Sequence, residues 1–360
     1  MAAVKKILVV GALGVVGRAA LERFAAQPGV QVLGLARRRP DFAPEATWLS
    51  ADLRDAAATL EALAAHQDVT HVVYAALNEQ PDLVQGWRSA GNADLNTTML
   101  AHLLDALQGA PLQHVTLMQG TKAYGVHTGR PMPVPARETD ALRDHRNFYF
   151  DQQDLLEARA QQQGFQWTGW RPQIVLGVAV GSAMNPVAAL GAYALLRKEQ
   201  GLPLAPVGHP HLLTECTDAR LIAEAIEWSW GAAQAHGEVF NIANGDIILW
   251  ARLWPRLAEF FDMPLGEPED VRLATEMPPL AGLWRRIAER EGLKVPELDT
   301  LIGLSWQYAE ATFASRRPFP VPPLVSTIKL RQAGFGACIA TDDCVLAHLQ
   351  AMRAQGYLPT

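Results

Sequence analysis

The 360-residue chain has only three cysteines, Cys216, Cys338 and Cys344, and none belongs to a C-x-x-C pair. Three such cysteines cannot build a disulfide framework, and this usage is typical of proteins kept in a reducing compartment. The first residues, Met1-Ala-Ala-Val-Lys-Lys, continue directly into an apolar run and do not resemble a cleavable signal. We therefore expect a cytoplasmic protein.

Long apolar runs and a strong positive charge are also absent. No stretch reaches the roughly eighteen apolar residues that a spanning helix needs, so no membrane partner is expected. The net charge is −6, and the longest basic run is Arg37-Arg38-Arg39, which argues against a nucleic-acid partner. His209 and His211 could form a metal pair, but no third ligand is spaced nearby, so we expect no metal site and favour a surface loop.

The composition and the order of apolar runs indicate a globular α/β protein. Hydrophobic residues make up 49% of the chain and charged residues 19%, which allows a sizeable core. Over the first 175 residues, short apolar runs alternate with helical patterns, as in repeated βαβ units. Strands are expected at 5–10, 30–36, 46–50, 70–76, 113–119 and 165–171, and helices near 15–27, 55–66, 81–108 and 148–163. The pattern predicts a doubly wound parallel sheet of the Rossmann type with helices on both faces.

The pattern loosens after Arg171-Pro172. Further strands are expected at 212–216 and 237–242, and further helices near 186–199, 217–231, 249–262, 281–292, 299–313 and 341–355. We predict a Rossmann domain over residues 1–175, with return segments at the sheet edge at about 205–245. Residues 176–204 and 246–360 are predicted to form a smaller, mostly helical substrate-binding region.

A glycine-rich turn follows the first predicted strand, with Gly11, Gly14 and Gly17 in the order G-x-x-G-x-x-G. In such a turn Gly11 permits the tight bend, Gly14 lets the backbone approach a pyrophosphate, and Gly17 allows close helix–sheet contact. The helix that begins there aims the backbone amides of Val15 and Val16 at phosphate. The segment therefore predicts a dinucleotide site.

The residues after the second and third strands indicate which dinucleotide is bound. An NAD site usually places a carboxylate about twenty residues beyond the last glycine, whereas this chain has Arg37 and Arg38 there. Guanidinium groups can bind a 2′-phosphate bidentately, so we expect NADPH or NADP+, although a solvated arginine turn is the alternative. By position, further contacts are expected at Asp52, Leu53, Ala75 and Ala76.

Two later segments supply candidate chemistry. The first is Leu117-Met-Gln119-Gly-Thr-Lys122-Ala-Tyr124-Gly125, and the second is Asn147-Phe-Tyr149-Phe-Asp-Gln-Gln-Asp154, where Asn147 is expected to cap a helix. The glycine spacing is that of short-chain dehydrogenases, yet no tyrosine in the chain is followed by lysine four residues later, as it is in most of those enzymes. Over about residues 5 to 262 the chain resembles the progesterone 5β-reductase/iridoid synthase-like enone reductases, an atypical branch of the extended short-chain dehydrogenases. Their TG-x-KHY and NFYY-x-x-ED motifs match these two segments.

The resemblance implies that Lys122 and Tyr149 are the catalytic pair of an NADPH-dependent enone reductase, with Arg37 and Arg38 selecting NADPH. Hydride addition to the β-carbon of an α,β-unsaturated carbonyl leaves negative charge on the oxygen. Tyr149 would stabilise that charge, a role that contributes about 3–4 kcal/mol in comparable oxyanion sites. Lys122 would hold the nicotinamide ribose and make the tyrosine a stronger donor. Cofactor contacts are expected at Gln119, Lys122, Tyr149, Pro172 and Ile174.

The sequence departs from the family pattern around the expected substrate. The usual serine position of extended short-chain dehydrogenases is Gly120, the family's histidine after the lysine is Ala123, the second tyrosine of NFYY is Phe150, and a tryptophan of the plant enzymes is Leu77. Steroid or iridoid specificity is therefore not transferred. We expect a small or mid-sized apolar enone or carbonyl substrate, bound against Leu77, Val126, Phe148 and Met184.

Other interpretations stay open at this point. The same fold could serve an ordinary carbonyl reductase or a nucleotide-sugar epimerase, or the chain could be a non-catalytic NADP(H)-binding sensor. Tyr124 is expected to be structural, Asn96 to bridge backbone and water, and Asn185 to cap a helix or contact a ligand. A homodimer is compatible with the sequence, although no predicted helix face indicates an interface.

Overall fold

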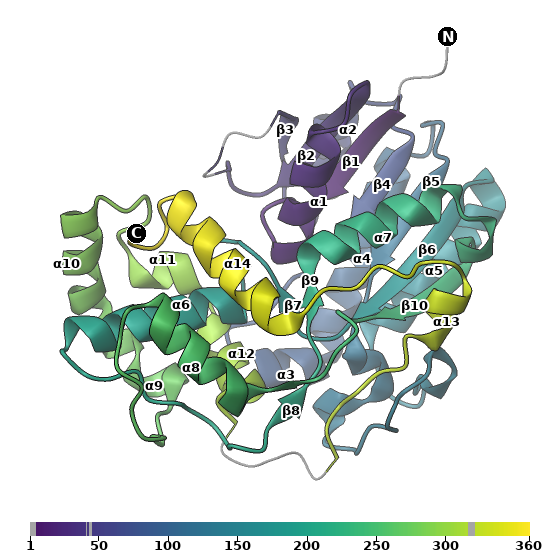
Figure 1. The fold of residues 1–360 in the computed structure, drawn as a ribbon. Coiled ribbons are helices and arrows are strands. Elements are labelled where there is room, and N and C mark those ends of the chain that lie inside the picture. The colour runs from purple at the N-terminus through teal and green to yellow at the C-terminus, as the bar shows by residue number, and fades with distance from the viewer. Residues whose placement is uncertain (1–4, 41, 43–44, 316–320) are drawn as a thin grey trace. The chain divides into compact units, whose positions relative to one another are not determined.

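A computed structural model describes residues 5–40, 42, 45–315 and 321–360 (Figure 1). The chain divides into two compact units. Unit 1 comprises Met1–Gln173, Ala219–Ile242 and Val325–Ala337, and unit 2 comprises Ile174–Asp218, Ala243–Leu324 and Cys338–Thr360. The predicted return segment of 205–245 therefore contributes strand β10 to unit 1 and strands β8 and β9 to unit 2.

Unit 1 is built on a seven-stranded parallel sheet in the order β10-β6-β5-β4-β1-β2-β3. Its strands are β1 Lys5–Val10, β2 Val30–Ala36, β3 Thr47–Ser50, β4 His71–Tyr74, β5 His114–Met118, β6 Gln166–Pro172 and β10 Glu238–Ile242. The first six are those expected from the apolar runs of the first 175 residues, and β10, at the edge of the sheet, is the further strand expected at 237–242. All four residues of β4 are buried, as expected for a strand that is covered on both faces.

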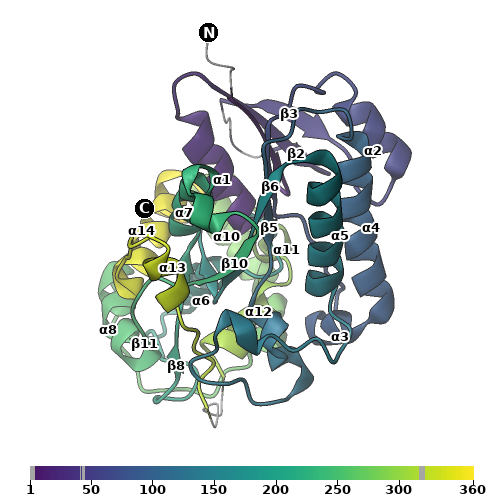
Figure 2. The ribbon, with the colours of Figure 1, turned by 90° about the vertical axis from the view of Figure 1, so that its right-hand side faces the viewer.

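Helices cover both faces of this sheet, as Figure 2 shows. Helices α1 Val15–Ala25 and α7 Ala219–Gly231 pack together on one face, and α2 Ala56–Leu63, α4 Ala90–Ala106 and α5 Phe148–Gln163 lie on the other. The core between the sheet and the second set contains Leu8, Val72, Leu100, Leu104 and Val115, all fully buried. The predicted doubly wound α/β fold is confirmed.

The single helix expected over 81–108 is two helices, α3 Leu83–Arg88 and α4. Ser89 interrupts them with an extended backbone at φ −77° and ψ 120°, and its side chain accepts a hydrogen bond from the backbone N–H of Asn92. Asp82 caps α3 in the same way. Short polar side chains offer the backbone these local bonds, which is why a cap can override a helical pattern.

Unit 2 is mostly helical and is centred on α6 Pro186–Glu199, which is buried from Pro186 to Arg197. Asn185 caps α6 by accepting a hydrogen bond from the N–H of Ala188, so the expected capping role is confirmed. The surrounding helices are α8 Trp250–Phe260, α9 Leu273–Glu276, α10 Ala281–Glu291, α11 Leu298–Ile302, α12 Ser305–Thr312 and α14 Thr341–Ala354. Trp250, Trp254 and Trp284 are buried in this core.

Short strands complete unit 2: β7 Val175–Leu176 pairs with β9 Thr217–Asp218, and β8 Leu213–Thr214 with β11 Ile248–Leu249. The helix expected over 299–313 breaks at Gly303, whose φ is +56°. A Cβ at Gly303 would lie 2.9 Å from the backbone of Gly181, so the break is set by a close backbone approach. Among the described residues, no helix has both the length and the apolar character needed to cross a bilayer.

Asn241 of β10 joins three segments of unit 1. Its side-chain amide donates to the carbonyl oxygens of Ala136 and Ser326, and its Oδ1 accepts a 2.5 Å hydrogen bond from the Tyr124 hydroxyl. Tyr124 is fully buried. Strand β10 also contacts helix α13 Ile328–Gln332. Asn241 therefore connects the loop at Ala136, the segment at Ser326 and the segment after β5 that carries Tyr124.

We expect Asn241→Ala to lower the free energy of unfolding by about 3 kcal/mol, because two carbonyls and one hydroxyl lose their partner inside the protein. Urea denaturation followed by circular dichroism measures the change. Gln234→Ala is the matched control, since its exposed amide bonds only to the carbonyl of Ala333, and it should change stability by less than about 0.5 kcal/mol. Equal effects of the two variants would contradict the role of Asn241.

Candidate active site

The glycine turn between β1 and α1 is tightly packed against the end of β4. Gly11 has φ +79°, and a Cβ there would lie 2.7 Å from the backbone of Ala75 and Ala76. A Cβ on Gly17 would lie 2.2 Å from the carbonyl oxygen of Gly11. Only glycine fits these two positions, which brings the turn and the small residues Ala75 and Ala76 together.

The N-terminus of α1 suits an anion. Gly14 is its N-cap and offers no capping side chain, and the first turn contains no acidic residue. Val15 and Val16 form that first turn, with Val15 buried and Val16 half-buried. The backbone amides and the positive end of the helix dipole are thus available to a phosphate group. These residues fit the expected dinucleotide.

Arg37 and Arg38 follow β2 and are exposed. Asp52, which follows β3, pairs with Arg54 at 2.6 Å, and the hydrogen bond from Arg54 lowers the pKa of this carboxyl. The guanidinium of Arg54, which the sequence pattern did not indicate, therefore compensates the charge of Asp52, one of the expected cofactor contacts. Leu53 is buried, and its carbonyl lies 2.8 Å from Nδ1 of His102.

The two predicted catalytic residues come from separate segments that polar contacts join. Lys122 lies in the short helix η1 Thr121–Tyr124, and Tyr149 lies in the first turn of α5. Asn147 caps α5 by accepting from the Tyr149 N–H at 3.1 Å, and its amide donates to the Lys122 carbonyl at 2.9 Å. Gln119 donates to the Tyr149 carbonyl and accepts from Arg171, so its side chain braces α5 against β6.

The hydroxyl of Tyr149 lies beside Gly120. A Cβ built at Gly120 would come within 3.1 Å of that oxygen and 3.8 Å of the Pro172 carbonyl. A side chain at residue 120 would therefore make a tight contact with the tyrosine hydroxyl, which would have to shift slightly. The glycine at residue 120 and the position of Tyr149, which comes from a different segment than Lys122, therefore belong to the same arrangement.

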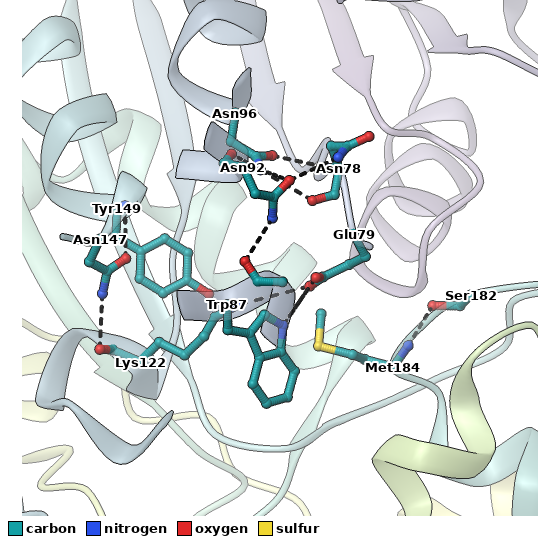
Figure 3. A network of polar contacts seen from close by, with 11 residues as sticks. Asn78, Glu79, Trp87, Asn92, Asn96, Lys122, Asn147, Tyr149, Ser182 and Met184 are labelled. Atoms are coloured by element: carbon teal, nitrogen blue, oxygen red, sulfur yellow. Dashed lines mark hydrogen bonds and ion pairs between the residues drawn. The ribbon is translucent and has the colours of Figure 1, made fainter. Parts of the chain in front are cut away.

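The ammonium of Lys122 is buried among aromatic rings, as Figure 3 shows. Its Nζ lies 4.8 Å from the ring centroid of Trp87, 5.4 Å from that of Phe148 and 5.3 Å from that of Tyr149. The Glu79 carboxylate lies 3.8 Å away. Burial lowers the pKa of Lys122 and the charge of Glu79 opposes this effect, while burial also raises the pKa of Glu79.

A set of asparagines holds the loop that carries Glu79. Asn96 of α4 accepts from the N–H of Asn78 at 2.8 Å and donates to its carbonyl at 3.1 Å, so it bridges backbone, as expected (Figure 3). The amide of Asn78 donates to Asn92. Sequence reasoning did not find Glu79 or Trp87. The available signal was an acidic residue just beyond the end of a fully buried strand.

The residues predicted to bind substrate or the nicotinamide belong to both units. Leu77 packs against Phe148 and Tyr149 in unit 1, and Val126 is half-buried in the short helix η2 Val126–Thr128. Pro172 ends β6 in unit 1, whereas Ile174 and Met184 belong to unit 2. The structure thus brings Leu77, Phe148, Tyr149 and Lys122 together within one unit.

In the described part of the chain, side chains of the types that can ligate a metal gather at one place, where Asp218, Cys344 and His348 of unit 2 are all buried. The His348 Nε2 lies 3.1 Å from the Asp218 carboxylate. This pair accounts for the cluster as a tie between α14 and β9. His209 and His211 lie in a loop, where Nδ1 of His209 accepts from the backbone N–H of His211.

Comparisons with known proteins agree with this geometry. The model of the NAD dependent epimerase/dehydratase family matches residues 7–243. The chain belongs to this family. Among curated relatives, the (S)-8-oxocitronellyl enol synthase of Nepeta cataria is 31% identical over 83% of this chain and 80% of its own length. The enzyme of the same name from Camptotheca acuminata is 28% identical over 98% and 93%.

Solved structures of the family show the same fold. The UDP-glucose 4-epimerase of Thermotoga maritima has a TM-score of 0.66 at 14% identity, covering 97% of this chain and 99% of that one. WbmH of Bordetella bronchiseptica, solved with NAD+, has a TM-score of 0.65 at 16% identity, covering 98% and 99%. The chain is thus an oxidoreductase of the short-chain dehydrogenase/reductase superfamily with a nicotinamide cofactor, and its resemblance to the iridoid synthase-like branch is confirmed.

We expect Asn147→Ala to lower the free energy of unfolding by about 1–3 kcal/mol, because α5 loses its cap and the Lys122 carbonyl loses a donor. Asn147→Asp keeps the cap acceptor and should lose less. Urea denaturation checks both values. The control is Asp55→Ala, which removes the exposed cap of α2 and should cost about 1 kcal/mol. An unchanged stability in Asn147→Ala would show that this side chain does not join the two segments.

Proposed function

We propose that this protein is an NADPH-dependent reductase of α,β-unsaturated carbonyl compounds that adds hydride in the 1,4-sense, with Tyr149 stabilising the enolate oxygen. The main support is that Lys122 and Tyr149, distant in sequence, meet in one unit with the ammonium 5.3 Å from the phenol ring. The names of the curated relatives support an enol-forming reaction, because each is called an enol synthase.

The cofactor would be held by the residues at the carboxyl edge of the sheet. Gly11, Gly14, Gly17, Val15 and Val16 would bind the pyrophosphate, and Arg37 and Arg38 the 2′-phosphate. Asp52, Leu53, Ala75 and Ala76 would line the adenosine half, and Gln119, Lys122, Tyr149, Pro172 and Ile174 the nicotinamide half. When bound, NADPH supplies the hydride at C4 of its nicotinamide.

The protein's own residues would control the charge that the reaction creates. The Tyr149 hydroxyl donates a hydrogen bond to the substrate carbonyl, and this bond strengthens as negative charge develops on the oxygen. The ammonium of Lys122 faces the same ring and favours that charge. Leu77 and Phe148 offer an apolar surface beside Tyr149, and we propose Val126 and Met184 as further contacts of a small or mid-sized apolar enone. Exclusion of water by such a surface strengthens both electrostatic contacts.

Carbonyl reduction or epimerisation on the same fold is the second candidate. Epimerases of known structure share the fold of this chain, but residue 120 is glycine, so the serine hydroxyl that would help to polarise a carbonyl is absent. A single phenol donor suits an enolate, whose charge is shared between oxygen and carbon. A cofactor sensor without turnover is the third candidate, and the retention of both Lys122 and Tyr149 argues against it.

The test is oxidation of NADPH at 340 nm with 2-cyclohexen-1-one, followed by product identification. We expect the saturated ketone, and Tyr149→Phe should reduce turnover about 100- to 1,000-fold while NADPH still binds, because the oxyanion loses its donor. Tyr124→Phe is the matched control and should keep its activity. An allylic alcohol as product would establish carbonyl reduction instead, and full activity in Tyr149→Phe would exclude this residue as the donor.

For the cofactor, we expect Arg37→Ala combined with Arg38→Ala to raise the KM for NADPH about 10- to 100-fold and to leave the KM for NADH nearly unchanged. The reason is the loss of charge-assisted hydrogen bonds to the 2′-phosphate, which at this exposed site together contribute about 1.4–2.7 kcal/mol. Arg39→Ala controls for the removal of a neighbouring exposed charge. Equal changes for both dinucleotides would show that these arginines do not select NADPH.

A further inference from the structure

The proposed chemistry requires Lys122 as an ammonium, yet its surroundings oppose that charge. The Lys122 side chain is 11% exposed, and among the described residues no group accepts a hydrogen bond from its Nζ. Removal of water from an ammonium favours the neutral amine and lowers the pKa of this group. Some other feature of the site must therefore favour the charged form.

The Glu79 carboxylate has the position and the environment to do so. It lies 3.8 Å from the Lys122 Nζ and is only 8% exposed, so solvent screens the pair weakly. The indole N–H of Trp87 donates to both carboxylate oxygens, at 3.1 and 3.0 Å. Because this N–H bonds to the charged carboxylate, it opposes the effect of burial on Glu79.

The backbone that carries Glu79 is held as firmly as its side chain. Asn78, the preceding residue, has its N–H, carbonyl and amide bound by Asn96 and Asn92 of α4. Asn92 also donates to the carbonyl of Gly86, next to Trp87. The acceptor and its donor are therefore positioned by the same helix.

Among the residues that the structure describes, the other titratable groups near Lys122 bring no compensating charge. Tyr149 of α5 presents its ring. His127 of η2 has its pKa lowered to about 4, first by burial and then by His145, Lys122 and Arg88, so it is neutral near pH 7. Arg88 adds a positive charge at the His127 carbonyl. Glu79 is the acidic group that acts on Lys122.

We propose that Glu79 is a positioning residue: held by the Trp87 indole, its carboxylate keeps Lys122 protonated and directs the ammonium to the face of the Tyr149 ring. The rings of Trp87, Phe148 and Tyr149 add cation–π attraction on the remaining sides. This inference rests on the proposed role of Lys122. It adds a third residue, from the loop after β4, to the pair supplied by η1 and α5.

A direct test measures Lys122 by NMR in protein without substrate. The chain has six lysines, so a protein labelled with ¹³C and ¹⁵N at lysine gives few side-chain signals, and Lys122→Met assigns the relevant one. The Glu79→Gln variant is isosteric and removes the charge. Its Lys122 signal should titrate about 1–3 pH units lower than in the unsubstituted protein, because the attraction of the carboxylate is lost while burial and the ring contacts remain.

Two more variants and one control show how the Lys122 titration depends on the Glu79 carboxylate. Trp87→Phe keeps a ring but removes the N–H donor, and it should shift the Lys122 titration in the same direction by less. Glu79→Asp keeps a carboxylate, so its Lys122 signal should titrate close to that of the unsubstituted protein. Glu61→Gln removes an exposed carboxylate on α2 and should leave the signal unchanged. Thermal unfolding reports whether each variant is folded.

The pH profile of enone reduction gives the functional consequence. In Glu79→Gln the alkaline limb of kcat should move to lower pH by the same interval as the Lys122 titration, with the KM for NADPH nearly unchanged. An unshifted Lys122 titration in folded Glu79→Gln would overturn the inference, and if that variant does not fold, an unshifted titration in folded Trp87→Phe would overturn it. Absence of enone reduction in the unsubstituted protein would instead overturn the proposed function, since the NMR titration does not depend on turnover.

Discussion

The removal of an ammonium from water is the constraint on which the arrangement around Lys122 in unit 1 depends. A charge buried without a partner is costly, and the structure surrounds Lys122 with a carboxylate and three ring faces. The carboxylate is itself buried and needs a donor, which Trp87 provides. The loop that carries Glu79 then needs a fixed path, which the asparagines of α4 provide. Each contact thus stabilises a buried polar or charged group that the preceding contact requires.

A second constraint is steric and concerns how the tyrosine and lysine are brought together. When both lie on one helical turn, the helix itself sets their spacing. Here they lie on η1 and α5, and side chains must do that work: Asn147 bonds to both segments, and Gln119 ties α5 to the end of β5. The cost is a larger set of buried polar groups that must all be satisfied. In return, the Tyr149 hydroxyl can lie beside Gly120, where no side chain is in its way.

Much of this arrangement could be predicted from the sequence, and the remainder shows what sequence patterns leave undetermined. The strands of unit 1 and the glycine turn were predictable because buried parallel strands leave continuous apolar runs and because Gly11 and Gly17 have no alternative residue. The helix breaks at Ser89 and Gly303 were missed, since a cap bond and a close backbone approach leave little trace in hydrophobic periodicity. Glu79 was missed for a related reason. Its meeting with Lys122 depends on the path of one loop, which no local pattern specifies.

The departures from the family motifs acquire a physical meaning in this setting. Ala123 is fully buried, so a histidine at that position would have to displace its neighbours. Phe150 is 5% exposed and lies under the guanidinium of Arg143, at 4.8 Å from the ring centroid. A tyrosine hydroxyl at residue 150 would therefore enter a packed and positively charged surrounding rather than the space beside Lys122. With phenylalanine at residue 150, Tyr149 supplies the phenol of this motif. The packing around Phe150 and the proposed chemistry both favour Tyr149 as the hydrogen-bond donor.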